Sequence, residues 1–356
     1  MKITSLKLEN FRSWPEYHLD LTDITILIGK NGVGKTNVLE SLWFLSSSRS
    51  WRTREEIELV NWGKEYTRIS AKIEVENTPH DLELFFSKGS PNVKPGKQLK
   101  IDGVKKRLIE IVGGLPSVLF SPETIDLVSG APGARRKFLD ILLSQTDRHY
   151  VLDLIEYGKV TKERNKLLLR LKMKRAKPDE LDFWDKKLVE LGTRIIKQRL
   201  EAIKFFNKYL SETYHKIANS DEELKIKYHP SVDEDRFMDI LVAGRERDIE
   251  QSATNYGPHR DDFGVYLGGR NIASFGSRGE YRSVVLSLKI LELKFLEEKR
   301  GEKPILLLDD IFSELDSERR MHLAKIVQDQ QTIITTTDID HIEKSLRTKA
   351  KIVDIK

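Results

Sequence analysis

Residues 29–36 read Gly-Lys-Asn-Gly-Val-Gly-Lys-Thr, a complete G-x-x-x-x-G-K-[ST] phosphate-binding loop. The apolar run 24–28 before it predicts a buried strand, and residues 37–45 predict the helix that follows. Strand, loop and helix in this order place backbone N–H groups and the positive end of a helix around phosphate oxygens. A chance Gly-rich turn would lack these flanking elements. The stretch therefore predicts an α/β fold that binds a nucleoside triphosphate.

Each part of the loop has an expected task at the phosphates. The glycines let consecutive N–H groups turn inward, Lys35 reaches the β- and γ-phosphates, and the Thr36 hydroxyl is expected to ligate Mg²⁺. The residues expected to contact the nucleotide here are Gly29, Lys30, Asn31, Gly32, Val33, Gly34, Lys35, Thr36 and Asn37.

The composition limits the classes of protein that need to be considered. At 356 residues the chain exceeds the usual size of a single core, so two lobes are expected. It has no cysteine, and its eight histidines show no H-E-x-x-H spacing, which argues against a zinc enzyme. The N-terminus lacks a signal-peptide pattern, and the apolar stretches are too short to span a membrane. We therefore expect a soluble, cytoplasmic protein with no membrane partner.

The sequence pattern changes twice along the chain. Residues 1–120 are predicted to be mixed α/β, residues 121–250 mostly helical, and residues 251–356 α/β again. The fold class expected from this order is a P-loop α/β head, lobe I, with an inserted and mostly helical lobe II.

Two elements of the second half are predicted in more detail. Helices over 148–173 and 179–214, separated by Pro178, predict an antiparallel helical hairpin of roughly 40–55 Å at 1.5 Å per residue. Residues 265–267 and 272–275 are expected to pair as a β-hairpin around two glycines.

Positive charge is concentrated in the predicted helical segment. Between residues 159 and 177 there are nine lysines and arginines against one acid, Glu163. Such a block favours a polyanion such as DNA, and a solvated helix face that binds nothing explains it equally well. A second basic run, 135–137, could contact DNA phosphates or be paired within the lobe. The DNA-contact candidates are Arg135, Arg136, Lys137, Lys159, Lys162 and Arg164.

An apolar strand ending in paired carboxylates supplies the second half of a nucleotide site. Residues 305–308 are Ile-Leu-Leu-Leu, followed by Asp309 and Asp310. This is the Walker B pattern, in which Asp309 is expected to bind Mg²⁺ beside Thr36. Asp310 is then placed to orient or deprotonate the attacking water.

The long interval between Lys35 and Asp309 holds a third motif. Residues 275–280 read Phe-Gly-Ser-Arg-Gly-Glu and run directly into a strongly apolar helix. Their position about 30 residues before Walker B matches the signature motif of ABC-type ATPases, with Ser277, Arg278 and Gly279 as its core. An ordinary helix cap would explain Ser277 and Gly279 about as well. Residues 313–316, ending at Asp316, resemble the D-loop of the same class.

The motifs together resemble the RecF family of bacterial recombination-repair ATPases, which is related to SMC proteins. The matching stretches are residues 8–13, 29–36, 121–123, 257–262, 277–280 and 309–316, in the family's order over nearly the whole chain.

The resemblance implies an ABC-type head in which ATP and Mg²⁺ are sandwiched between two protomers. Lys35 and Thr36 of one chain would face the signature residues of the other, so ATP would drive homodimerisation. Arg12 and Ser13 would lie near the adenine and α-phosphate. Glu123 would stand in the Q-loop region, although it is not a glutamine.

The resemblance also implies a function on DNA. It predicts an ATP-switched DNA-binding protein with weak, DNA-stimulated ATPase activity, acting in single-strand gap repair, recombinase loading and the SOS response with RecR and RecO as partners. Asp310 replaces the usual catalytic glutamate and Thr337 stands at the switch-histidine position, so slow hydrolysis is expected.

Two other functions use the same nucleotide motifs. An ABC-type energy subunit of a transporter is one, and the polar, basic hairpin and the Asp-Asp pair argue against it. A P-loop phosphotransferase is the other, and the signature motif and the long interval between the Walker motifs count against it.

Overall fold

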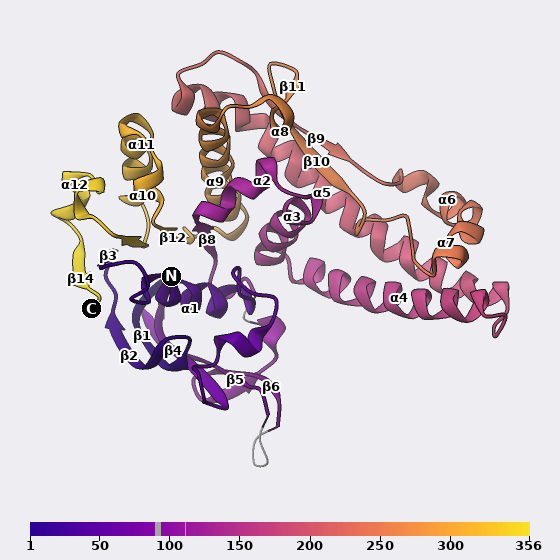
Figure 1. Ribbon diagram of the computed structural model, residues 1–356, viewed down its shortest axis with the longest axis horizontal. Coiled ribbons are helices and arrows are strands. Elements are labelled where there is room, and N and C mark those ends of the chain that lie inside the picture. Colours follow the sequence, from indigo (N-terminus) through magenta and orange to yellow (C-terminus); the bar gives the residue numbers. More distant parts are fainter. Residues whose placement is uncertain (90–93, 111) are drawn as a thin grey trace. The chain divides into compact units, whose positions relative to one another are not determined.

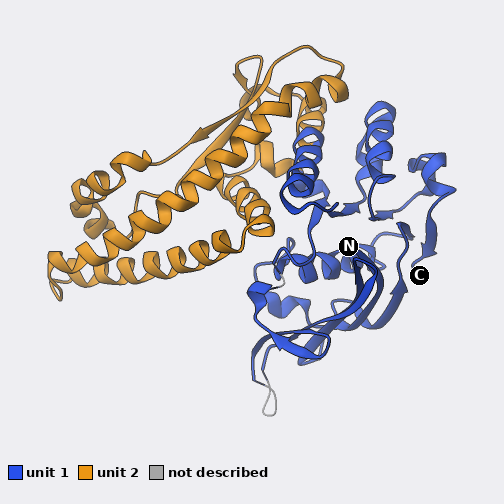
Figure 2. Ribbon diagram, turned by 180° about the vertical axis from the view of Figure 1, so that it is seen from behind, with its two compact units in different colours: residues 1–124, 286–356 blue, residues 125–285 orange. Residues whose placement is uncertain are grey.

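The computed structural model describes residues 1–89, 94–110 and 112–356 (Figure 1). The chain forms two compact units, one made of residues 1–124 and 286–356 and the other of residues 125–285 (Figure 2). The first boundary lies close to the predicted residue 120. The second lies well beyond the predicted residue 250, because the strand that starts at Asp262 pairs along its length with a strand of the second unit.

A parallel sheet forms the centre of the first unit. Its strand order is β14-β3-β13-β12-β8, so β13 lies between the strand before the phosphate loop and the Walker B strand. The apolar runs of β3 and β12 are almost entirely buried, as expected for strands covered on both faces. The strands are β3 (Ile24–Ile28), β8 (Ser117–Phe120), β12 (Ile305–Asp309), β13 (Thr332–Thr336) and β14 (Lys351–Asp354).

An antiparallel sheet forms the second layer of this unit. Its order is β2-β1-β4-β5-β6-β7, and inward and outward side chains alternate along β4. Such alternation marks a sheet that buries one face and leaves the other toward solvent. The strands are β1 (Lys2–Phe11), β2 (Trp14–Asp20), β4 (Tyr66–Val75), β5 (Thr78–Ser87), β6 (Gly96–Ile101) and β7 (Val104–Lys106).

Helices of the first unit follow the strands of the parallel sheet. The helix after the phosphate loop, α1, is buried along most of its length. The helices are α1 (Lys35–Ser47), α10 (Ile311–Glu314), α11 (Ser317–Val327) and α12 (Lys344–Arg347), with 3-10 turns η1 (Glu56–Leu59), η2 (Leu108–Glu110), η3 (Pro122–Ile125) and η6 (Ile339–His341). The unit boundary passes through α9 (Arg278–Arg300).

The second unit is built on the predicted helical hairpin (Figure 1). Helix α4 (Arg148–Lys172) and helix α5 (Leu181–Ala218) are joined through the 3-10 turn η4 (Pro178–Glu180), which confirms the predicted break at Pro178. Gly192 of α5 allows a close approach, since a Cβ there would lie 2.6 Å from the ring of Phe237. The other helices are α2 (Asp126–Ser129), α3 (Pro132–Thr146), α6 (Phe237–Ala243), α7 (Arg245–Gln251) and α8 (Ile272–Phe275), with a 3-10 turn η5 (Glu234–Arg236).

A small sheet completes the second unit and corrects one prediction. Its order is β11-β10-β9, made of β9 (Leu224–His229), β10 (Asp262–Leu267) and β11 (Arg270–Asn271). The predicted hairpin around Gly268 forms, but its second arm ends at Asn271. Residues 272–275 are the helix α8, because the Asn271 side chain accepts a hydrogen bond from the Ala273 N–H and caps it.

Candidate nucleotide-binding site

The phosphate loop connects β3 to α1 with the backbone that its glycines allow. Gly32 and Gly34 have φ of 85° and 103°, in the left-handed region that favours glycine. A Cβ on Gly34 would lie 2.9 Å from Nε1 of Trp14, which donates a hydrogen bond to the Gly34 carbonyl at 3.2 Å. The glycine at 34 is thus required both by its φ and by the close packing of the β1–β2 turn.

Lys35 is the buried cation of the loop. Its Nζ donates to the carbonyl oxygens of Gly29 at 2.7 Å and Lys30 at 2.8 Å. Burial lowers the pKa of Lys35 below its usual value, and the charges of Asp310 and Asp309 oppose this shift. The ammonium group therefore sits within the field of the two Walker B carboxylates.

Asp309 and Thr36 meet as the sequence predicts. The Thr36 hydroxyl donates to Oδ1 of Asp309 at 2.8 Å. The hydroxyl of Thr335, on the intervening strand β13, donates to the same oxygen at 2.7 Å. Burial raises the pKa of Asp309, while these two hydrogen bonds oppose the rise. Thr335 was missed by the sequence reasoning, since only the strand order places it here.

Asp310 has a different environment from its neighbour. Its backbone is left-handed, with φ of 52°, and its N–H donates to Oγ1 of Thr335 at 3.0 Å. Its Oδ1 is buried and has no hydrogen-bond partner among the described residues. Burial raises the pKa of Asp310, and the Lys35 charge opposes that rise. A carboxylate oxygen without a partner beside the phosphate loop is free to accept a proton or a water.

These groups surround one cavity of about 250 Å³. Arg52, which follows α1 in an irregular segment, lines it with a side chain 37% exposed. It is a second cation that the sequence reasoning missed, because no motif marks it. The lining residues are Asn31, Gly32, Gly34, Lys35, Thr36, Asn37, Arg52, Asp309, Asp310 and Thr335.

A larger cavity of about 670 Å³ shares Asn37 and Arg52 with the first. The predicted residues Arg12 and Ser13 both line it. The Ser13 hydroxyl accepts a hydrogen bond from the Asn37 side chain at 2.9 Å, so the end of β1 is tied to the first turn of α1. The other wall is Ile57, Glu58, Val60, Asn61, Trp62, Gly63 and Lys88, and the Trp62 side chain is fully exposed.

The signature stretch begins α9 with a reciprocal cap. The Ser277 N–H donates to Oε2 of Glu280 at 2.6 Å, and the Glu280 N–H donates to the Ser277 hydroxyl at 3.2 Å. These bonds form a capping box, and they lower the pKa of the Glu280 carboxyl. Arg278 and Gly279 follow in the first turn. Asp316 similarly caps α11 by accepting from the Arg319 N–H at 3.0 Å.

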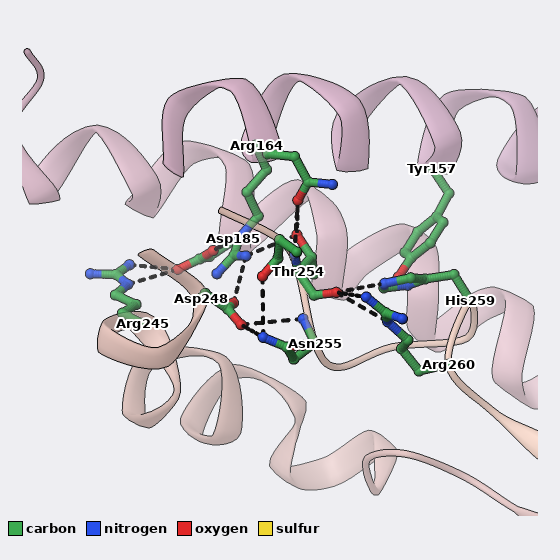
Figure 3. Close-up of polar contacts among 11 residues, drawn as sticks. Tyr157, Arg164, Asp185, Arg245, Asp248, Thr254, Asn255, His259 and Arg260 are labelled. Atoms are coloured by element: carbon green, nitrogen blue, oxygen red, sulfur yellow. Dashed lines mark hydrogen bonds and ion pairs between the residues drawn. The ribbon is translucent and has the colours of Figure 1, made fainter. Parts of the chain in front are cut away.

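Two DNA-contact predictions are wrong because the side chains are buried in ion pairs. The Arg164 side chain is 0% exposed and donates to Asp185 at 2.6 Å and to Asp248 at 2.7 Å, as Figure 3 shows. Arg135 pairs through Nε and Nη2 with both carboxylate oxygens of Asp262, at 2.7 and 2.9 Å, and through Nη1 with a backbone carbonyl. Neither guanidinium can reach a DNA phosphate.

The other basic candidates lie at the surface of the second unit. Lys137, Lys159 and Lys162 are exposed, and Lys159 forms an ion pair with Glu156 at 3.2 Å. Arg136 is half-buried and donates to the carbonyl oxygen of Asp261 at 2.7 Å. As DNA contacts these four stay predictions.

The phosphate loop, the Walker B carboxylates and a capped signature helix define an ABC-type P-loop ATPase head. The chain belongs to the RecF/RecN/SMC N-terminal domain family, whose model matches residues 2–355.

Named relatives agree with that assignment. The chain is 35% identical to the DNA replication and repair protein RecF of Bacillus cytotoxicus, over 100% of this chain and 97% of the relative. It resembles a solved structure of the recombination mediator protein RecF with ATP in the RecFOR pathway, with a TM-score of 0.89, 32% identity, and coverage of 96% of this chain and 93% of that one. An Smc head domain from Pyrococcus furiosus shares the fold alone, with a TM-score of 0.55, 15% identity, and coverage of 99% and 94%. No helix within the described residues is long and apolar enough to cross a bilayer.

Proposed function

We propose that this chain is a RecF-type DNA-binding ATPase whose ATP binds at the cavity between the phosphate loop and β12. The observation that carries the proposal is the 2.8 Å contact between the Thr36 hydroxyl and Asp309, beside the buried Lys35 ammonium. A hydroxyl, a carboxylate and a cation converge there on one cavity, as binding of a nucleotide triphosphate with its metal requires.

Thr36 and Asp309 would hold Mg²⁺ in this site. Their oxygens are the ligand type that Mg²⁺ prefers, and the described residues contain no cluster of three or more His, Cys, Asp or Glu side chains that could hold a metal without help. The metal would therefore depend on phosphate oxygens to complete its shell. When bound, Mg²⁺ would neutralise negative charge on the β- and γ-phosphates.

Asp310 is the proposed general base for the attacking water. Its unpartnered Oδ1 is available to accept a water proton, and its raised pKa brings the group closer to neutral pH. The side chain is one methylene shorter than glutamate, and Thr337 occupies the position of the switch histidine. Hydrolysis is therefore expected to be slow, with DNA stimulating it.

The larger cavity is proposed to hold the adenosine. It shares the lining residues Asn37 and Arg52 with the phosphate cavity, and it is also lined by Arg12 and Ser13. The exposed indole of Trp62 offers a flat apolar surface at its wall.

The second half of the nucleotide site is proposed to come from another copy of the chain. Ser277, Arg278 and Gly279 stand at the N-terminus of a long helix, where N–H groups and Arg278 would favour a phosphate. ATP would then drive homodimerisation on DNA, with Asp316 near the dimer contact and hydrolysis as the release step. Gap repair, recombinase loading and the SOS response in the cytoplasm, with RecR and RecO as partners, would be the setting.

Analytical sedimentation with ATP, with and without duplex DNA, tests this proposal. The wild type should dimerise with ATP at micromolar protein, whereas Lys35→Met and Ser277→Arg should stay monomeric. Lys72→Met and Ser274→Arg are matched controls at exposed positions and should behave as the wild type. A wild type that stays monomeric with ATP would refute the sandwich, and normal dimerisation of Ser277→Arg would refute the role of the signature in the partner.

A further inference from the structure

Glu40 is a fully buried carboxylate one turn beyond Thr36 on α1. Its side chain is 0% exposed, and it accepts hydrogen bonds from three other side chains. Nε and Nη2 of Arg12 donate to it at 3.0 and 2.8 Å, the Ser50 hydroxyl at 2.5 Å, and Nη1 of Arg52 at 3.2 Å. One carboxylate thus joins the end of β1, the helix of the phosphate loop and the segment after α1.

The Ser50 hydroxyl links the Glu40 carboxylate to the backbone of the segment that contains Arg52. A hydroxyl has one proton and two lone pairs. Because the proton goes to Glu40, the lone pairs are left to accept the backbone N–H groups of Arg52 at 2.9 Å and Thr53 at 3.1 Å. The segment that carries Arg52 is therefore folded around the carboxylate.

Both arginines held by Glu40 face the nucleotide cavities. Arg12 lines the larger cavity and Arg52 lines both. Arg52 uses only Nη1 in the described part of the chain, for Glu40 and for the Asn37 side chain at 2.8 Å. Its Nε and Nη2 donors thus remain available for an anion. A buried ion pair is costly to assemble. If the pair of Glu40 and Arg52 only held α1 in place, it would not need an arginine with unused donors beside a cavity.

We propose that Glu40 is a positioning residue that fixes Arg52 for contact with the phosphates of the nucleotide and Arg12 at the wall of the adenosine cavity. This inference rests on the proposed binding of ATP at the two cavities. Glu40 itself touches neither the nucleotide nor the reacting atoms. It acts by holding two guanidinium groups in fixed orientations before the ligand arrives.

Charge and geometry make opposite predictions for Glu40→Gln. The substitution removes a negative charge next to a site for an anion, so charge alone would tighten ATP binding. It also replaces two acceptor oxygens by one and sets an NH₂ group against arginine donors, so the fixed orientations would be lost. If geometry dominates, as we propose, binding weakens.

Isothermal titration with ATP and Mg²⁺ on the full chain tests the inference. Glu40→Gln should weaken binding by about ten- to a hundredfold, the loss expected when a charge-assisted hydrogen bond to phosphate is misplaced. In the double variant Glu40→Gln with Arg52→Gln, the total loss should be smaller than the product of the two single losses, since both act through one guanidinium. Binding by Glu40→Gln equal to or tighter than the wild type would overturn the inference, as would losses that multiply.

Two further variants keep the result interpretable. Ser50→Ala removes only the hydroxyl between Glu40 and the Arg52 backbone, so it tests the same link if Glu40→Gln does not fold, and unchanged ATP affinity would overturn the inference. Glu16→Gln is the control, because Glu16 is an exposed glutamate of β2 that pairs with Lys7 of β1. If the wild type fails to bind ATP, the proposed function itself fails. If the wild type binds and Glu40→Gln binds equally, only the role of Glu40 fails.

Discussion

Replacing Arg164 by leucine should destabilise the second unit strongly. Arg164 lies at the centre of a buried network that ties α4 to α5 and α7 (Figure 3). Its guanidinium also donates to the Thr254 hydroxyl at 2.9 Å. The leucine would fill much of the volume but would leave two buried carboxylates without this cation.

The two carboxylates would suffer unequally. Asp185 would keep Arg245, whose Nε and Nη2 donate to it at 2.9 and 2.6 Å. Asp248 would lose its only ion-pair partner within the described residues and keep the Asn255 amide at 2.8 Å. Removing one partner of a buried pair costs about 3–5 kcal/mol. For a unit of this size the melting temperature should fall by roughly 6–20 °C.

Urea unfolding followed by tryptophan fluorescence measures the loss in free energy of unfolding of the second unit. Trp184 is the only tryptophan between residues 125 and 285, and it packs on the apolar cluster of Leu167, Leu168, Leu171 and Leu181. Subtracting the signal of a Trp184→Phe variant isolates the unfolding transition that Trp184 reports. Arg170→Leu is the matched control on the same helix, with a side chain 57% exposed, and should change stability by less than about 0.5 kcal/mol.

A loss below about 1 kcal/mol for Arg164→Leu, or one equal to that of Arg170→Leu, would refute the reasoning. Adding Asp248→Asn to Arg164→Leu should recover part of the stability, because it neutralises the orphaned charge. At temperatures where Arg164→Leu is folded, its affinity for DNA should match that of the wild type.

Three other predictions concern the site and the surface. Burial raises the pKa of Asp310, the proposed base, so this carboxylate becomes protonated at a pH above the ordinary pKa of 3.8. Phosphate release should therefore decline on an acid limb centred above pH 3.8, and full activity down to that pH would contradict the role of Asp310 as base. Glu280→Ala should cost about 0.5–2 kcal/mol in urea unfolding through loss of the capping box, and an unchanged midpoint would count against that cap. Alanine at Lys159 or Lys162 should each reduce the steepness of log affinity for DNA against log salt concentration by about one. An unchanged slope would mean that the helix face carrying these lysines does not contact DNA.

Sequence patterns predicted local structure well where the chain itself sets the conformation. Residues 29–36 could be recognised because glycines at fixed spacing permit one loop conformation before a helix. The break at Pro178 follows from the missing N–H of proline. Residues 272–275 were predicted to be a strand because a short apolar run fits a strand and a helix equally well. They form a helix, which the Asn271 side chain caps.

The charged residues were predicted least well, because charge alone does not say where a side chain lies. Arg164 lies in a run of lysines and arginines, yet its side chain is fully buried. It forms ion pairs there with Asp185 and Asp248, which come from distant parts of the chain. Arg52 and Glu40 belong to no motif, and they matter only through the cavities and partners that surround them.

The sequence by itself determined that a phosphate loop, a Walker B strand and a capped signature helix exist, since each depends on neighbouring residues. Only the tertiary structure decided how they combine within the first unit. Parallel strands β3 and β12 both pair with β13, so their carboxyl ends meet at one edge and bring Thr36, Thr335 and Asp309 within hydrogen-bond distance. The chain cannot specify that meeting locally, because strand order is fixed by the burial of whole strands in a common sheet.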